Sequence, residues 1–254
     1  MNGAIAFRTI LAKEIRRYLR IWIQTIVPPM ITTALYFIIF GQLIGSQIGP
    51  IAGYSYMDYI VPGLILMAVI TNAYGNVVSS FYGAKFSHYV EELLIAPIPN
   101  SLILLGYVAG GVARGLTVGL AVTLVAMFFT SLQLHNLAVV LAVVVLTSVV
   151  FSLGGFINAI YAKSFDDISI IPTFVLTPLT YLGGIFYSID MLPPFWREVS
   201  LLNPILYMIN AFRYGLLGIS DIALGTAFGV TALFIIVLFA YALFLLQRGV
   251  GLKS

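Results

Sequence analysis

Long stretches without any charged residue constrain this chain more than any other feature. No Asp, Glu, Lys or Arg lies between Arg20 and Asp58, and only 8% of the chain is charged, whereas 61% is hydrophobic. Soluble domains carry about 25% charged residues, so too little polar surface remains to cover a water-soluble globule. Because a backbone surrounded by lipid must satisfy its own hydrogen bonds, the sequence predicts an all-α integral membrane protein.

Six stretches reach the length of about 20 apolar residues that a helix needs to cross a bilayer. They are residues 22–44, 59–81, 101–129, 136–161, 168–187 and 225–246. A further apolar stretch, residues 199–212, is too short to span and contains Asn203-Pro204. Short re-entrant outer helices are therefore predicted within residues 188–224, and residues 1–254 as a whole form one six-span transmembrane domain.

Residues 4–20 show the pattern of an amphipathic helix. Apolar side chains repeat at spacings of three and four, while Lys13, Arg16 and Arg20 fall on the opposite side. Such a helix lies in the membrane interface with its basic groups at anionic headgroups, and a plain positively charged anchor is the alternative. The apolar series is Phe7, Leu11, Ile15, Tyr18 and Trp22.

The distribution of basic residues predicts the orientation of the spans. Five basic residues lie among the first 20. If six spans follow, four more basic residues lie in segments on the same side of the membrane as the N-terminus, namely Lys85, Lys163, Arg248 and Lys253. Only two, Arg197 and Arg213, lie in segments on the opposite side. Since Lys and Arg concentrate on the cytoplasmic side of membrane proteins, both termini are predicted to be cytoplasmic.

The sequence offers no motif for catalysis, for a metal or for a resident cofactor. No G-x-x-x-x-G-K-[ST] phosphate loop occurs, so the chain is not expected to bind ATP in that way. It has no cysteine, and its two histidines, His88 and His135, lie far apart. No carboxylate lies deep in a predicted span, which weakens the case for a proton-driven carrier. The basic N-terminal residues adjoin an apolar span and are therefore typical of a membrane flank, not of a nucleic-acid site.

The segment 83–99 is the longest predicted cytoplasmic loop between spans. A helix over Phe86–Leu94 would have one apolar face and a second face carrying charge, before Pro97 and Pro99 end it. A short rigid helix between two spans can transmit force from a cytoplasmic partner, and a solvated loop helix is the alternative. The residues predicted to contact such a partner are Lys85, Phe86, His88, Tyr89, Glu91 and Glu92.

Two predicted spans carry a stripe of small polar residues on one helical face. The stripes consist of Asn72, Asn76 and Ser79 in the second span, and of Ser169, Thr173, Thr177, Thr180 and Gly184 in the fifth. Polar faces of membrane helices turn toward protein or water. These stripes therefore either line a pathway or pack against neighbouring helices.

Arg114 is the one charge deep inside a predicted span. A charge at this depth costs at least about 2.5 kcal/mol, so its surroundings must compensate it. Three interpretations stay open: Arg114 faces a pathway and binds an anionic substrate, pairs with helix carbonyls, or lies nearer the inner surface.

Four segments together resemble the ABC-2 type permeases, the membrane subunits of a class of ABC exporters. Tyr59–Gly63 (YIVPG) opens the second span in the family's manner, and Glu92–Pro97 (ELLIAP) matches its cytoplasmic coupling segment. Gly183–Tyr187 (GGIFY) with Leu192-Pro193 matches the end of the fifth span. Leu202–Pro204 (LNP), followed by Ala211–Arg213 (AFR) and Gly218, matches the region before the sixth. The order and spacing of the four make the resemblance specific.

The resemblance implies a function that spacing alone does not. Such permeases form homodimers in the bacterial inner membrane and bind two copies of a separate ABC ATPase, which uses ATP and Mg²⁺ to drive export. The segment 83–99 would then contact the ATPase. The second and fifth spans would face the translocation pathway. A stand-alone channel or facilitator, and a structural membrane protein that recruits cytoplasmic partners, are the alternatives, and the substrate is not readable from the sequence.

Overall fold

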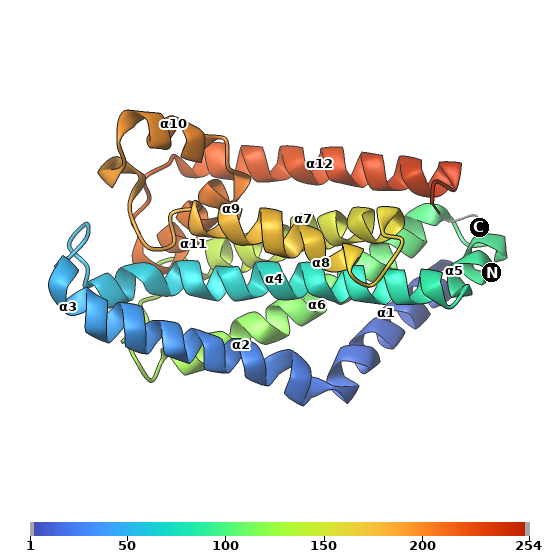
Figure 1. Cartoon of the computed structure of the whole chain (residues 1–254), viewed down its shortest axis with the longest axis horizontal. Coiled ribbons are helices and arrows are strands. Elements are labelled where there is room, and N and C mark those ends of the chain that lie inside the picture. The colour runs from blue at the N-terminus through green and yellow to red at the C-terminus, as the bar shows by residue number, and fades with distance from the viewer. Residues whose placement is uncertain (1–2, 252–254) are drawn as a thin grey trace.

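The computed structural model describes residues 3–251 as an elongated bundle of helices lying roughly side by side (Figure 1). The first helices are α1 (Gly3–Arg20), α2 (Trp22–Tyr36), the π-helical η1 (Phe37–Ile44), α3 (Gly45–Ile48), α4 (Tyr56–Phe86), α5 (Tyr89–Ile95) and α6 (Asn100–Ala126). The later ones are α7 (Leu137–Tyr161), α8 (Asp167–Ile171), the π-helical η2 (Pro172–Leu176), α9 (Thr177–Tyr181), the short 3-10 turn η3 (Ile189–Met191), α10 (Pro194–Leu201), α11 (Pro204–Leu217) and α12 (Leu224–Arg248). The described chain begins and ends at the same end of the bundle as α5, and α3 and α10 lie at the opposite end.

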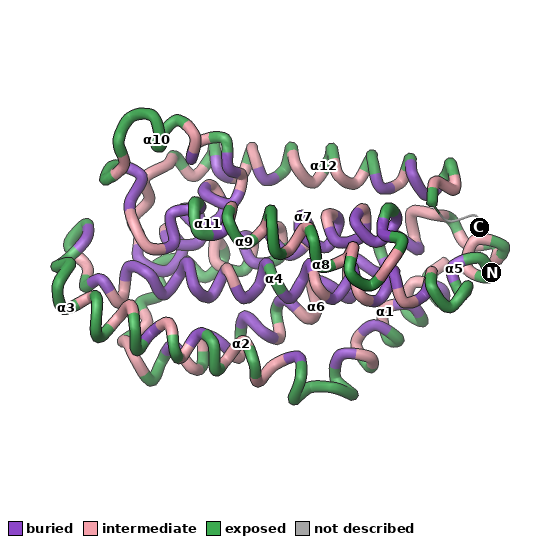
Figure 2. The backbone as a smooth tube through the Cα atoms, viewed as in Figure 1, coloured by how far each residue is buried: buried purple, intermediate pink, exposed green. Residues whose placement is uncertain are grey.

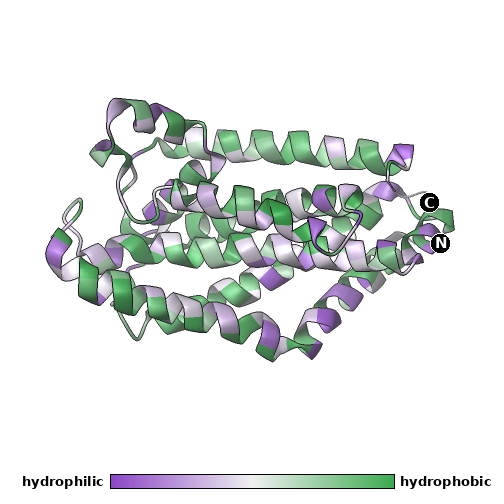
Figure 3. Cartoon of the chain, viewed as in Figure 1, coloured by the Kyte–Doolittle hydropathy of each residue, from purple (hydrophilic) through white to green (hydrophobic). Residues whose placement is uncertain are grey.

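The prediction of an all-helical membrane protein is confirmed, with five helical stretches long and apolar enough to cross a bilayer. These stretches are Trp22–Ile48, Tyr56–Phe86, Asn100–Ala126, Leu137–Tyr161 and Leu224–Arg248. Side chains of α12 such as Leu233, Ile236 and Val237 are exposed, and the helix is apolar along most of its length, except at its C-terminal end (Figure 3). Lipid is the solvent that such a surface requires.

The segment predicted as the fifth span, residues 168–187, is helical only as far as Tyr181. Pro178 has no N–H to donate within the helix, and just before it the Thr177 N–H reaches back five residues to the Pro172 carbonyl, which widens the helix to a π-turn. The helix ends before Gly183-Gly184, where Gly184 has a φ of +76°. This stretch is consequently shorter than the five that meet the length of a span.

Helix α4 is the centre of the bundle and is buried along nearly its whole length (Figure 2). It packs against α6 and α7, where residues without large side chains let the backbones approach. At Gly155 of α7, a Cβ atom would lie 2.6 Å from the carbonyl oxygen of Tyr74 in α4. The position of α4 therefore depends on glycine at the facing sites.

Helix α1 packs on α6 through a face that differs from the predicted apolar series. Its buried residues are Ala6, Ile10, Glu14 and Tyr18. Of the predicted series, only Tyr18 is among them, whereas Phe7, Leu11 and Ile15 lie half-buried beside it. The reason lies in α6, where Gly106 and Gly110 leave room for the side chains of Ile10 and Glu14.

Candidate functional site

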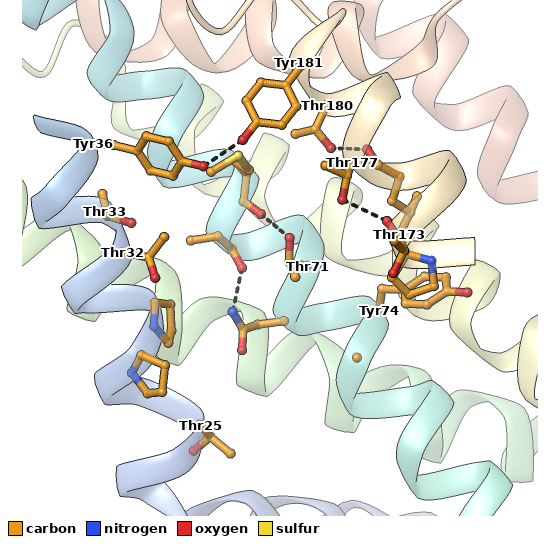
Figure 4. Close-up of a pocket in the computed structure, with 18 of the residues that line it drawn as sticks. Thr25, Thr32, Thr33, Tyr36, Thr71, Tyr74, Thr173, Thr177, Thr180 and Tyr181 are labelled. Atoms are coloured by element: carbon orange, nitrogen blue, oxygen red, sulfur yellow. Dashed lines mark hydrogen bonds between the residues drawn. The ribbon is translucent and has the colours of Figure 1, made fainter. Parts of the chain in front are cut away.

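A cavity of about 610 Å³ lies between α2, α4 and the segment α8–α9 (Figure 4). Threonines from all three elements point into it, together with Pro28, Pro29 and Met67. The labelled threonines are Thr25, Thr32 and Thr33 of α2, Thr71 of α4, and Thr173, Thr177 and Thr180 of η2 and α9. The cavity thus lies alongside the central helix α4 and is walled mostly by small side chains.

Several of these hydroxyls bond to carbonyl groups of their own helix. Thr71 donates to the Met67 carbonyl at 3.0 Å, and Thr177 donates to the Pro172 carbonyl at 2.9 Å. Thr25 of α2 instead donates to the Tyr18 carbonyl of the preceding helix, α1, at 3.2 Å. These donors are already used, whereas the hydroxyls of Thr32, Thr33 and Thr173 have no hydrogen-bond partner in the described structure, so the cavity presents methyl groups together with some free hydroxyls. Such a wall suits an apolar or amphipathic occupant better than a fully polar one.

Aromatic rings close the cavity at the end nearer α3. The hydroxyls of Tyr36 and Tyr181 lie 2.7 Å apart and join α2 to α9. Phe186 stacks on Tyr181 with a centroid distance of 5.8 Å and contacts Phe40 at 4.7 Å. Opening the cavity at this end therefore requires α2 and α9 to separate and the Tyr36–Tyr181 bond to break.

The structure brings four of the six predicted pathway residues to this cavity. Asn72, Thr173, Thr177 and Thr180 line it. Asn76 and Ser79 do not: Asn76 is fully buried, and the Ser79 hydroxyl donates to the Gly75 carbonyl at 2.6 Å. Both accept hydrogen bonds from Arg17 of α1.

A buried carboxylate, Glu14 of α1, lies in the cluster that surrounds Asn76. Glu14 is 0% exposed, and no local sequence pattern had singled it out. It accepts hydrogen bonds from Ser80 at 2.6 Å and from Asn76 at 3.4 Å, and it forms an ion pair with Arg17 at 3.4 Å. The hydrogen bonds that join Glu14 and Arg17 to α4 residues therefore hold α1 against the central helix α4.

Arg114 of α6 reaches toward the same face of α4. Its Nη2 donates to the Asn72 Oδ1 at 3.0 Å. Of the three interpretations left open for Arg114, pairing with helix carbonyls finds no support among its hydrogen bonds in the described structure. Arg114 is instead joined to a residue that lines the cavity.

Arg213, counted with the outer basic residues from sequence, is completely buried. Its guanidinium lies 4.0 Å above the Tyr59 ring and donates to the Gly184 carbonyl at 2.6 Å. Arg213 of α11 therefore ties the turn that follows α9 to the start of α4.

The helix predicted over Phe86–Leu94 is divided in two. Helix α4 continues to Phe86, and α5 begins at Tyr89 after a break in which His88 has a φ of +60°. Phe86 and Tyr89 are 64% and 58% exposed, and Glu91 and Glu92 are exposed as well.

A hollow of about 500 Å³ lies beside α5 and is lined by Tyr82, Lys85, Phe86, His88 and Glu91 among others. Lys85 is not free, since its Nζ donates to the carbonyls of Ile160 and Ala162 at 2.6 and 2.8 Å and so caps the end of α7. His88 and Glu91 lie 3.1 Å apart. Four of the six predicted contact residues thus line this hollow, although Lys85 is engaged within the bundle, and Tyr89 and Glu92 do not line it.

Comparison with known proteins gives consistent matches over most of this architecture. The family described as ABC-2 type transporter matches residues 5–217. The inner membrane transport permease YadH of Escherichia coli K12 is 60% identical over 250 residues, which cover 98% of both chains. Nodulation protein J of Rhizobium leguminosarum bv. viciae is 24% identical over 217 residues, covering 84% of this chain and 83% of that protein. The cavity and α5 both lie inside the matched regions.

Proposed function

The chain belongs to the ABC-2 type transporter family, and we propose that it is the permease subunit of an ABC exporter driven by a separate ATPase. Its similarity to an inner membrane permease, together with five apolar helices, makes it a multi-pass inner-membrane protein. The proposed subunit supplies the membrane pathway, whereas ATP and Mg²⁺ are used by the partner chain.

The observation that carries the proposal is the position of α5 at one end of α4. Helix α5 exposes aromatic and acidic side chains beside a hollow, and α4 continues from there to form one wall of the cavity. A displacement of α5 by a cytoplasmic partner would therefore act on α4 and, through it, on the cavity. A stand-alone channel would have no need for such a surface.

The pathway itself is proposed to form between two copies of the chain. The cavity is bounded by only three elements, α2, α4 and α8–α9, and the neighbouring side chains of Ile31, Leu35 and Phe174 are exposed. A second copy packed against α2 and α9 would cover these side chains and complete the wall. The lining of small side chains, which combines methyl groups with some free hydroxyls, favours a weakly polar or amphipathic substrate.

The topology proposed for the subunit has six spans with both termini in the cytoplasm. The helix α8–α9 runs beside the spanning helices and would be the fifth span, and α10 and α11 would enter the outer leaflet without crossing it. Helix α11 has 14 residues, about 21 Å at 1.5 Å per residue, which is shorter than the hydrocarbon core of about 30 Å.

Thiol labelling tests this topology in a chain that has no cysteine of its own. Asp190 is a suitable position because its side chain is 68% exposed. We expect a membrane-impermeant maleimide to label an Asp190→Cys variant from the periplasmic side of intact spheroplasts. A Ser164→Cys variant, in the turn between α7 and α8, should react only after the membrane is opened. Labelling of the position-190 thiol solely from the cytoplasmic side would contradict the topology.

Charge reversal on α5 tests the coupling surface. The double variant Glu91→Lys with Glu92→Lys should reduce co-purification of the ATPase at least about tenfold, because truncating or reversing a partly desolvated charge at an interface costs a few kcal/mol. The homodimer should persist, since its packing lies in the membrane. Glu198→Lys on α10, at the opposite end of the bundle, is the matched control. Unchanged ATPase binding together with unchanged transport in the double variant would restore the interpretation of α5 as a solvated loop helix.

A further inference from the structure

Two arginine guanidinium groups donate hydrogen bonds to successive turns of α4 beside the cavity. Arg17 donates to the Asn76 Oδ1 and to the Asn76 carbonyl, both at 2.8 Å. Arg114 donates to the Asn72 Oδ1 at 3.0 Å. Residues four apart on a helix have Cβ atoms about 5–6 Å apart, so two cations from different helices, α1 and α6, converge on one face of α4.

The charges in this cluster do not cancel. Glu14 forms an ion pair with Arg17 at 3.4 Å and is itself fully buried. Arg114 forms no ion pair with any carboxylate of residues 3–251. The Nε atoms of both Arg17 and Arg114 are buried and have no hydrogen-bond acceptor within the described chain. The cluster therefore holds two guanidinium groups and one carboxylate, which pairs with Arg17 alone, and one donor on each guanidinium group remains unused.

The cluster lies at the end of the cavity opposite the aromatic closure. Asn72, which accepts from Arg114, lines the cavity. Arg17 lies one turn before the bend at Ile21, where α1 and α2 diverge (Figure 1), and Gln24 and Thr25 just beyond that bend also line the cavity. The Arg17 side chain is 29% exposed, so an approaching ligand can reach it. The two guanidinium groups do not line the cavity themselves, but they lie beside residues that form this end of it.

We propose that Arg17 and Arg114 bind the phosphate-bearing headgroup of an amphiphile whose hydrocarbon tail occupies the cavity between α2, α4 and α9. Guanidinium groups present a planar fork of donors that suits phosphate oxygens, and an anion beside them would balance the charge that the single carboxylate, Glu14, leaves uncompensated. A buried cation also becomes far less unfavourable when an anion compensates it. The cavity, with its threonine methyl groups, prolines and Met67, provides the apolar half of the site. This assignment names the substrate class of the proposed export function and rests on it.

Native mass spectrometry of the full-length protein tests the site without any ATPase. Detergent-purified protein is titrated with phosphatidylglycerol or with phosphatidylcholine, whose zwitterionic headgroup carries no net charge. We expect tighter retention of phosphatidylglycerol and a loss of about tenfold in that preference for Arg114→Gln, because a charge-assisted hydrogen bond is at stake. Arg17→Gln should cost less, since Glu14 already compensates that group. Arg16→Gln, on the exposed face of the same helix, is the matched control and should retain the preference within about twofold.

The readout is the ratio of the two lipid affinities within one preparation, so a general loss of folded protein does not mimic the result. Inorganic phosphate at millimolar concentration distinguishes a headgroup from free phosphate as the source of the anion, and we expect it not to displace the lipid. Displacement by phosphate, or an unchanged preference in both Arg114→Gln and Arg17→Gln, would overturn the proposal. Failure of ATPase binding to α5 would instead count against the export function and leave the lipid measurement unaffected.

Discussion

Replacing Gly155 by alanine should destabilise the protein by about 2–3 kcal/mol, the range that overpacking of a close helix contact produces. A Cβ atom at this position would lie 2.6 Å from the Tyr74 carbonyl oxygen and 3.3 Å from the Val78 nitrogen, both backbone atoms of α4. Backbone atoms cannot rotate away, so α7 and α4 would have to separate. Because α4 is the central helix, this separation would also disturb its contacts with α6. The free energy of unfolding in mixed micelles of increasing SDS content measures the effect.

The adjacent glycine supplies the matched control. A Cβ atom at Gly154 would meet only the Tyr74 ring, at an ordinary 3.8 Å. Gly154→Ala should therefore leave stability unchanged or raise it by up to about 1 kcal/mol, because alanine is the better helix former. Equal stability of the two alanine variants would show that α4 and α7 do not approach as closely as described.

The fold class could be predicted from the sequence because a backbone in lipid must form its hydrogen bonds within the protein, which few structures allow. Uncharged stretches of about 20 residues can only be buried or span a bilayer, and the helices over the first, second, third, fourth and sixth predicted spans appear with shifts of a few residues at their ends. The fifth was predicted too long. Residues 168–187 are uncharged throughout and mostly apolar. Pro178 removes a backbone donor and Gly184 adopts a positive φ, and hydropathy registers neither effect.

The candidate site could be predicted only in part, because its polar residues depend on distant partners. The stripe Thr173–Thr177–Thr180 was visible at helical spacing, and the structure places it on the cavity wall. Asn76 belongs to a similar stripe, yet its partner is Arg17, 59 residues earlier in the chain. No local pattern in the sequence reveals a pairing over such a distance. The roles of these residues in transport stay predictions.

The burial of Glu14 was not predicted, because the buried face of the N-terminal helix was assigned from its most apolar residues. Ile10, Glu14 and Tyr18 form a row at spacings of four, and α6 carries Gly106 and Gly110 at the same spacing. This matching spacing was the signal in the sequence: a row on α1 with one carboxylate could pack against the two glycines of α6. A buried carboxylate is stable there because donors from Ser80, Asn76 and Arg17 all reach it.

Replacing Glu14 by alanine should destabilise the protein by about 3–5 kcal/mol, the cost of leaving one partner of a buried ion pair uncompensated. Arg17 would remain against α4 without a carboxylate, Ser80 would lose its acceptor at 2.6 Å, and a void would open beside Gly110. Glu14→Gln should cost less but remain unfavourable. Its amide can accept from Ser80 through Oε1, but it would direct N–H groups toward the donors of Asn76 and Arg17, which now share Oε2.

Two further variants separate the charge effect from loss of volume in the same SDS unfolding measurement. Glu198→Ala removes an exposed glutamate from α10 and should change stability by no more than about 0.5 kcal/mol. The double variant Glu14→Gln with Arg17→Gln should be more stable than the sum of the two single effects predicts, because neither uncompensated group then remains. Additive effects, or a Glu14→Ala variant as stable as Glu198→Ala, would mean that this cluster does not hold α1 against α4. The position of α1 would then have to depend on its contacts with α6, where Ile10 packs at Gly106 and the Tyr18 hydroxyl lies 3.2 Å from the Thr117 hydroxyl.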